Sequence, residues 1–231
     1  MDRRALLTAL LVAGAVGLSA CSDSPSQAKE PTPAALLATA KQKLDATTGV
    51  SFTLASAAVP KGVNGVSAAK GIGVVNPAPA FKGTVNATVS GVTGTVDVIA
   101  VDKDVYMKLF TPEYNKVDPA VFGAPNPAQL FNKSSGISTL LPATTALVRG
   151  DRAREGNDVL KTVRGKVPGD RIAALFVFGD KSGVFDVTYG LDEKTGQLRK
   201  ATMTGPFFPG ATSTYTLLLT GYGNPATITK P

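Results

Sequence analysis

Cys21 is the residue of this chain best placed for a defined covalent reaction, because it is the only cysteine and directly follows Leu18-Ser19-Ala20. A small residue before such a cysteine is the lipobox pattern, in which the thiol is acylated and the cysteine becomes the first residue of the mature protein. A lone cysteine cannot form a disulfide within the chain, and two or more acyl chains give stable membrane anchoring. The alternative is a chance cysteine at the end of an ordinary membrane anchor.

Other side chains that could do chemistry are few. The chain contains no histidine, which is the commonest general acid and base at neutral pH and, with cysteine, the usual zinc ligand. The carboxylate pairs Asp102/Asp104 and Asp192/Glu193 could bind a hard cation or act together in catalysis, but each is also typical of a solvated hairpin turn. Gly71-Ile72-Gly73 lacks the lysine and hydroxyl residue of a phosphate-binding loop. We therefore expect no enzyme, no cofactor and no metal site.

The residues around Cys21 predict how the chain is divided. Two arginines near the start precede an uncharged, largely apolar run that ends in small residues, which is the order of a secretory signal peptide. We expect a signal peptide over 1–20, the lipidated cysteine and a flexible polar tether over 21–32, and a single domain over 33–231. The expected location is the cell membrane, with the lipid anchor on its extracytoplasmic face.

Composition limits the class of domain and its partners. The net charge is +7, and valine, threonine, glycine and alanine are plentiful while aromatic residues make up 6% of the chain. This composition favours a β-rich domain. The basic excess suits anionic headgroups, or it serves solubility alone. No dense lysine and arginine cluster with interleaved aromatic residues is present, so nucleic acid is not an expected partner.

The elements that must position a binding site follow from the spacing of apolar residues. Thr32-Pro33 and the apolar spacing after it predict an amphipathic helix over 34–46. Alternating segments from Val50 to Phe110 predict an antiparallel meander. Two short helices are expected next, one after an Asn126 cap and one over 134–141 that Pro142 ends. Strands resume further on, with a helix over 169–176.

In their order along the chain, several segments resemble the LppX/LprA/LprF/LprG family of mycobacterial and related actinobacterial lipoproteins. The resemblance covers the whole mature region, from the lipobox, tether and leading helix to the last strand. It is carried by the following stretches of sequence: Gly83-Thr84-Val85-Asn86-Ala87-Thr88-Val89, Val105-Tyr106-Met107-Lys108-Leu109, Asn126-Pro127-Ala128-Gln129-Leu130-Phe131-Asn132, Arg164-Gly165-Lys166-Val167 and Gly221-Tyr222-Gly223-Asn224-Pro225.

The resemblance implies an α+β fold: a strongly curved antiparallel sheet, like half a barrel, with helices on its concave side enclosing an apolar cavity. It also implies a ligand, namely an acylated envelope lipid such as a triacylglyceride, a phosphatidylinositol mannoside or lipoarabinomannan, or a phthiocerol-type lipid. A major-facilitator transporter is an implied partner. Val85 matches the family position near the cavity mouth. The residues expected to line the cavity are Phe52, Leu54, Val85, Ala87, Val89, Val96, Val98, Leu130, Phe131, Ile137, Leu140 and Leu141.

Alternation alone does not separate a cavity wall from a plain core, because both place apolar residues on one face. Three functions therefore remain open at this point. The first is an envelope lipoprotein that binds acylated lipids and carries them toward the outer envelope. The second is a scaffold or accessory lipoprotein for a membrane transporter or cell-wall protein. The third is a hydrolase of envelope glycolipids, which the absence of histidine disfavours.

Overall fold

The computed structural model describes residues 30–109 and 112–231. Within them, Pro31–Pro231 forms one compact unit that contains all the helices and strands described below and its own apolar core. The expected signal peptide over 1–20, the lipidated Cys21 and all but the last residues of the tether over 21–32 lie outside the described residues. No helix within those residues is long and apolar enough to cross a membrane.

Helices and strands follow one another in a pattern that is mostly β. The elements are α1 (Pro33–Ala46), β1 (Gly49–Ala57), β2 (Gly65–Val74), β3 (Ala80–Val89), β4 (Val92–Val101), β5 (Asp104–Lys108), β6 (Asn115–Val117), the 3-10 helices η1 (Pro119–Phe122), η2 (Pro127–Phe131) and η3 (Ile137–Thr139), α2 (Leu140–Ala143), β7 (Thr145–Arg149), β8 (Ala153–Glu155), β9 (Asp158–Pro168), α3 (Gly169–Phe176), β10 (Val184–Asp192), β11 (Leu198–Phe208) and β12 (Ala211–Thr220).

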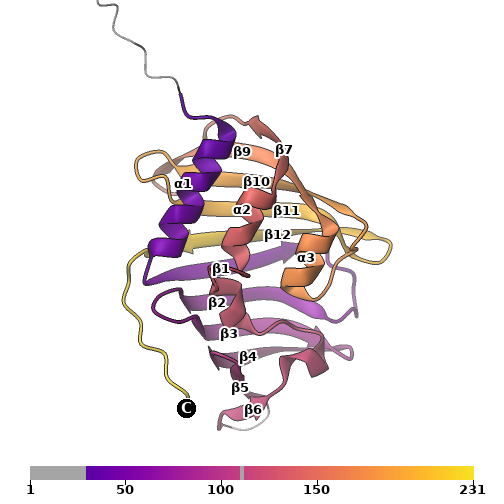
Figure 1. The fold of residues 1–231 in the computed structure, drawn as a ribbon. Coiled ribbons are helices and arrows are strands. Elements are labelled where there is room, and N and C mark those ends of the chain that lie inside the picture. The colour runs from indigo at the N-terminus through magenta and orange to yellow at the C-terminus, as the bar shows by residue number, and fades with distance from the viewer. Residues whose placement is uncertain (1–29, 110–111) are drawn as a thin grey trace, which may run out of the picture. The chain divides into compact units, whose positions relative to one another are not determined.

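The described strands form one antiparallel sheet of 12 strands (Figure 1). Its order is β6-β5-β4-β3-β2-β1-β12-β11-β10-β9-β7, and β8 pairs with β9 beside this path. The sheet curves but does not close, because β6 and β7 stand at opposite edges. This confirms the expected large, curved antiparallel sheet, built mainly from neighbouring hairpins whose two-residue side-chain period places alternate residues on opposite faces.

Helix α1 forms where its capping signals predict it. The Thr32 hydroxyl accepts a hydrogen bond from the Ala35 amide (3.2 Å), and Pro33 occupies the first turn, where its missing amide proton costs nothing. Leu37, Ala40 and Leu44 form the buried stripe that holds the helix on the rest of the fold.

The second short helix differs from the sequence-based expectation. Residues 134–141 do not form one helix ended by Pro142; the chain instead makes η3 and then α2, and Pro142 lies inside α2. A proline is tolerated there because the first turn of a helix has no intrahelical acceptors for its amide protons. The Asn126 cap of η2 is confirmed, since its side-chain oxygen accepts from the Ala128 amide (3.0 Å).

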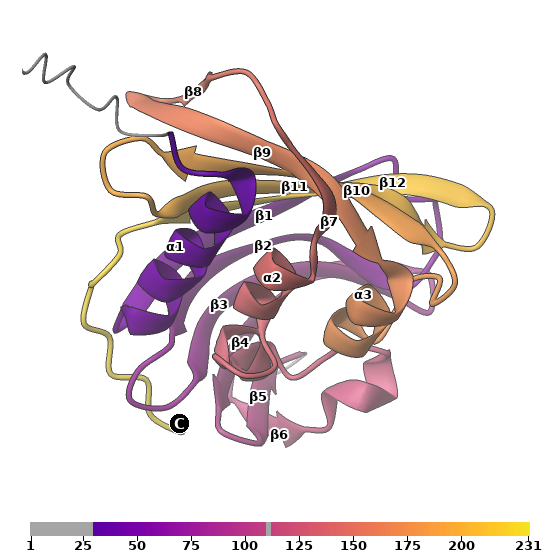
Figure 2. The same cartoon turned by 45° about the horizontal axis from the view of Figure 1, so that its top comes forward.

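Helices α1, α2 and α3 all lie on the same face of the sheet (Figures 1 and 2). We name this the inner face. The opposite, outer face carries hydroxyl and charged side chains, which form cross-strand contacts such as Thr204 with Thr214 (2.8 Å) and Lys166 with Asp186 (2.6 Å). A polar outer face and an apolar inner face are what an antiparallel sheet with one covered side requires.

Because the sheet is a meander, its turns gather at two ends, which we name the apolar end and the charged end. The apolar end carries the turns that join β1 to β2, β3 to β4 and β11 to β12, together with α3 and the loop before β10. The charged end carries the turns that join β2 to β3, β4 to β5, β8 to β9 and β10 to β11. In Figure 1 the hairpin between β11 and β12 marks the apolar end at the right.

Candidate functional site

A continuous line of apolar residues crosses the inner face from strand to strand. Cross-strand pairing places Leu54 opposite Ala69 on one side and opposite Leu217 on the other. The line continues outward through both neighbours, since Ala69 pairs with Val85 and Leu217 with Ala201. We name this line the apolar row; its members, each packed against the core but only half-buried, are Val96, Val85, Ala69, Leu54, Leu217 and Ala201.

The register brings together the strand residues that the sequence singled out. Phe52 and Leu54 share the inner face with Val85, because Leu54 connects to Val85 through Ala69. By the same two-residue period, the remaining strand candidates fall on this face and differ only in burial. Phe52 and Val98 are buried, whereas the half-buried ones lie closer to the apolar end and are Leu54, Val85, Ala87, Val89 and Val96.

Toward the charged end, an aromatic cluster fills the space above the sheet. Phe52 of β1, Phe81 of β3 and Phe131 of η2 lie with ring centroids 5.3 to 6.4 Å apart. The Phe131 ring packs directly on the backbone of Gly73, where a Cβ would lie only 2.1 Å from the ring. The three rings therefore close the inner face at this end by direct packing.

A second aromatic cluster lies under α3, at the apolar end. Phe178, just after α3, stacks on Phe208 with centroids 5.9 Å apart, and Phe207 meets both Phe185 and Tyr215 edge-on at 4.7 Å. This cluster covers strands β10 to β12 and leaves the β1 to β4 part of the same face half-exposed. The apolar row thus runs between two aromatic clusters.

Two tyrosines on the inner face are buried and hydrogen-bonded. The Tyr189 hydroxyl bonds to the Thr144 hydroxyl (2.9 Å), and burial raises the pKa of Tyr189 to about 12. The Tyr215 hydroxyl donates to the Val66 carbonyl (2.9 Å), and burial raises the pKa of Tyr215 to about 12 as well. Both phenols therefore stay neutral at physiological pH and act as hydrogen-bond groups within an apolar wall.

The helical candidates lie in the layer above the sheet. Phe131, Leu140 and Leu141 are buried, whereas Leu130 and Ile137 are half-buried and face a small space next to α1. That space has a volume of about 10 Å³ and is lined by Leu44, Asp45, Val75, Leu130, Phe131, Asn132, Ile137 and Ser138. It has room for about one water molecule.

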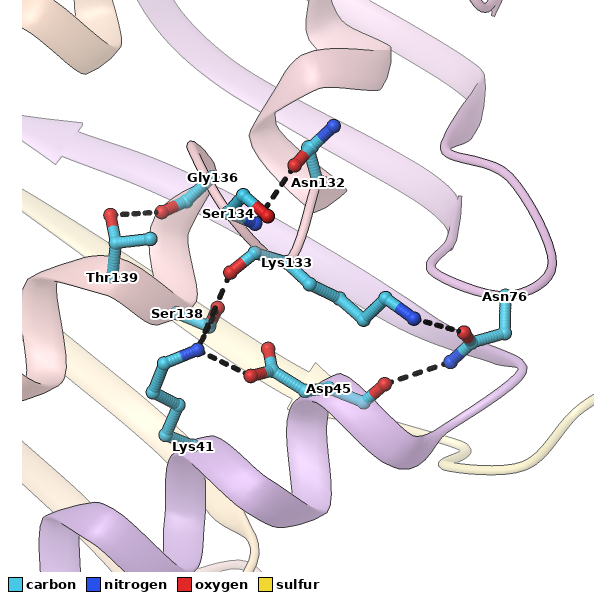
Figure 3. Close-up of polar contacts among 9 residues, drawn as sticks. All are labelled: Lys41, Asp45, Asn76, Asn132, Lys133, Ser134, Gly136, Ser138 and Thr139. Carbon is cyan, nitrogen blue, oxygen red and sulfur yellow. Dashed lines mark hydrogen bonds and ion pairs between the residues drawn. The ribbon is translucent and has the colours of Figure 1, made fainter.

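A polar network joins α1 to the segment between η2 and η3 beside this space (Figure 3). The Lys41 ammonium forms an ion pair with Asp45 and donates to the Lys133 carbonyl (3.3 Å) and, at the limit of hydrogen-bond length, to the Ser138 hydroxyl (3.5 Å). Lys133 in turn donates to the Asn76 side-chain oxygen (2.8 Å). We name these five residues the α1 latch, because they hold α1, the η2–η3 segment and the β2–β3 turn together.

A larger pocket lies away from the inner face. It has a volume of about 140 Å³ and is lined by Ala153, Arg154, Leu160, Thr162, Thr188, Gly190, Lys200 and Thr202, on strands β8 to β11. Sites for drug-sized ligands measure roughly 300–1,000 Å³. Neither this pocket nor the small space beside α1 has that volume.

The carboxylates that the sequence placed in hairpin turns have structural partners. Asp104 pairs with Lys116 (2.7 Å) and Lys230 (2.6 Å), and these two ammonium groups lower the pKa of Asp104 to about 2. The Asp192 carboxylate accepts from the amides of the β10–β11 turn. Within residues 30–109 and 112–231, no three acidic, histidine or cysteine side chains gather as a metal site.

Comparison with known protein families identifies the family of this chain. The LppX_LprAFG lipoprotein family matches residues 32–228, which is most of its length. The chain belongs to this family. No curated protein matches the chain closely. Membership of the LppX_LprAFG family indicates attachment to a membrane of the cell envelope through a lipid anchor.

Two solved structures of LppX_LprAFG members share the fold. The crystal structure of LprF from Mycobacterium bovis aligns with a TM-score of 0.72 at 14% identity, covering 86% of this chain and 96% of that one. The crystal structure of the Mycobacterium tuberculosis lipoprotein LppX aligns with a TM-score of 0.64 at 16% identity, covering 87% of this chain and 100% of that one. At these identities the likeness establishes the fold alone.

Three of the six residues in the apolar row are not among those that the amino-acid sequence of this chain predicts as cavity-lining. Ala69, Leu217 and Ala201 occupy the row beside the expected Leu54 and Val85. Leu217 lies in a run of three leucines, and the two alanines are small, so none of them stood out by alternation. Their place in the row follows only from strand pairing, which joins residues that are far apart in the sequence.

Proposed function

We propose that this lipoprotein binds the acyl chains of envelope lipids on its inner face and carries them across the space between membrane and outer envelope. The observation that carries the proposal is the apolar row: six aliphatic side chains in register over six neighbouring strands, all only half-buried. A plain core would bury such residues fully, since each buried methylene is worth about 0.8 kcal/mol. A half-covered apolar row of this length is suited to an extended hydrocarbon chain.

The length of the row supports an acyl chain as the ligand. Six adjacent strands are separated by five steps of about 4.8 Å, so the row is about 24 Å long. Burial of a dozen methylenes along it would supply ample affinity with no reactive or charged group, at about 0.8 kcal/mol for each. The proposed function therefore needs no enzyme chemistry, cofactor or metal.

Binding of a whole lipid requires the helical layer to separate from the sheet. The proposed cavity lies between the inner face, as its concave wall, and the helices, and the α1 latch is the contact that must loosen for it to widen. Leu130, Ile137, Leu140 and Leu141 would then form the opposite wall. Of the latch residues only Ser138 is buried, and polar contacts that solvent reaches reopen more readily than packed apolar ones.

The cargo proposed is the class that the family resemblance implies: triacylglycerides, phosphatidylinositol-based glycolipids or phthiocerol-type lipids. Delivery on the extracytoplasmic face of the membrane, with a major-facilitator transporter as partner, completes the proposal. A scaffold lipoprotein that contacts a transporter without carrying lipid is the alternative. The two differ in one observable: only a carrier retains lipid after purification from its host.

Val85→Trp tests the proposed function, because an indole at the second position of the apolar row would occupy the path of the acyl chain. The matched control is Thr84→Trp, which places the same side chain on the outer face one residue earlier in β3. Native mass spectrometry of Pro31–Pro231 should find bound lipid in the wild type and in Thr84→Trp, and at least tenfold less in Val85→Trp. Equal lipid content in both variants, or none in the wild type, would overturn the proposal.

A further inference from the structure

Four valines project into solvent around the apolar end. Among the large apolar side chains of the described residues they have the highest exposed fractions: 79% for Val121, 69% for Val92, 57% for Val177 and 55% for Val184. Val92 follows the β3–β4 turn, Val177 follows α3, Val184 begins β10 and Val121 lies on η1. In both views η1 lies next to α3 at this end (Figures 1 and 2). We name these four residues the valine rim.

Val177 occupies its position against local preference. It caps the C-terminus of α3 in the left-handed region, with φ of +68°, where glycine is the usual residue. A β-branched residue in that region is a conformational outlier. Glycine would fit this backbone without strain, and because Val177 is 57% exposed, little burial of its isopropyl group offsets the strain. A backbone outlier of this kind points to a functional role.

Two residues of the valine rim, Val92 and Val177, adjoin apolar side chains of the inner face, whereas Val184 lies on the outer face because its neighbour Phe185 points inward. Val92 pairs with Val89, and along β3 the same face carries Ala87 and then Val85 of the row. On the other side, Val177 is followed directly by Phe178, which stacks on Phe208 in the second aromatic cluster. An acyl chain that passes from Val92 along β3 to the row would stay in contact with apolar side chains throughout.

We propose that the valine rim inserts into the surface of a lipid bilayer and so presents the apolar row to the lipid it collects, an inference that rests on the proposed function. A bilayer fits better than a protein partner, because the four valines stand on separate elements and a fluid surface can receive them individually. The charged side chains beside α3 cancel in sign, namely Asp170, Arg171, Asp180 and Lys181, and the β1–β2 turn at this end adds one positive charge, Lys61. Insertion should therefore depend on apolar contact rather than on anionic headgroups.

Vesicle flotation with Pro31–Pro231, which lacks Cys21 and hence any lipid anchor, tests the proposal. The wild type should float with pure phosphatidylcholine vesicles, and addition of about 0.5 M salt, which is well above the roughly 0.15 M at which exposed charges more than about 8 Å apart are screened, should change this little. Val177→Gly should lower the partition coefficient about tenfold, the value of one buried valine side chain, without loss of stability. Val121→Ser should act similarly.

The matched control is Val148→Ser, which removes an exposed valine from β7, outside the rim. Flotation equal to that of the wild type is expected. The proposal fails if the wild type does not float, if Val148→Ser weakens flotation as much as Val121→Ser, or if salt abolishes flotation, which would indicate charge-driven binding.

A second readout separates this inference from the proposed function. Lipid offered in detergent micelles should load the rim variants as fully as the wild type, because the row is intact, as native mass spectrometry would show. Rim variants that float normally while Val85→Trp loses its lipid would overturn membrane insertion and leave lipid carriage standing. A wild type that floats normally but never binds lipid would overturn lipid carriage and leave membrane insertion standing.

Discussion

The charged end and the apolar end of the sheet are built on different principles. At the charged end, ion pairs fasten the turns, among them Arg152 with Glu193 (2.7 Å) and Lys200 with Glu155 (2.8 Å). There the inner face is closed by the rings of Phe52, Phe81 and Phe131. At the apolar end the turns carry exposed valines, and the inner face over β1 to β4 is left half-covered.

This difference shows where the fold gives up stability. Aliphatic side chains that remain half in water forgo part of the free energy that burial would supply, and a β-branched residue at positive φ adds strain. Both features fall at the apolar end, whereas the charged end has the closed packing of an ordinary core. An uneven distribution of this kind is what a ligand-binding protein with one accessible side requires.

The largest expected difference between the two ends is in the free energy of unfolding when one apolar side chain in each region is truncated. Phe131→Ala should lower the free energy of unfolding by about 3–5 kcal/mol, because it leaves a cavity in a closed cluster. Val96→Ala, in the half-covered row, should lower it by about 1 kcal/mol or less. Urea denaturation of both variants measures the contrast. Equal losses would mean that the two regions are packed alike.

A smaller effect of opposite sign is expected at the apolar end. Val177→Gly relieves a left-handed backbone that costs a non-glycine residue about 1–2 kcal/mol, while the added freedom of the unfolded chain takes back about 0.4–1 kcal/mol. The net result should be a gain of about 0.5–1 kcal/mol in the free energy of unfolding. A clear loss in thermal or urea denaturation would show that Val177 contributes to packing after all.

The smallest effect concerns pH at the charged end. Because Lys116 and Lys230 lower the pKa of Asp104 from 3.8 to about 2, the ionised carboxylate stabilises the folded state above pH 3.8. That contribution is lost as the pH falls through about 2, below which the carboxylate is protonated in both states. The difference in urea midpoint between the wild type and Asp104→Asn should therefore be constant from pH 7 to about pH 4 and shrink below it. A difference that grows on acidification would contradict the assigned pair.

The sequence by itself determined the local elements and the faces of the strands. Thr32-Pro33 starts α1 and Asn126 caps η2 because such signals act within one turn of chain. Phe52, Leu54, Val85 and Val96 share a face because side chains alternate strictly along a strand, and the family resemblance supplied the curved sheet. The expectation that Pro142 ends a helix is wrong, because α2 begins at Leu140 and so places this proline in its first turn.

Only the tertiary structure decided which of these inner-face residues are sealed and which are accessible. Phe52 and Leu54 are two residues apart on one strand, yet one is buried under Phe131 and the other lies in the half-covered row. Burial depends on which helix from a distant part of the chain packs above each residue, and no local sequence pattern determines that packing. The gathering of four valines from separate elements at one end has the same origin, because strand order and turn position are properties of the assembled sheet.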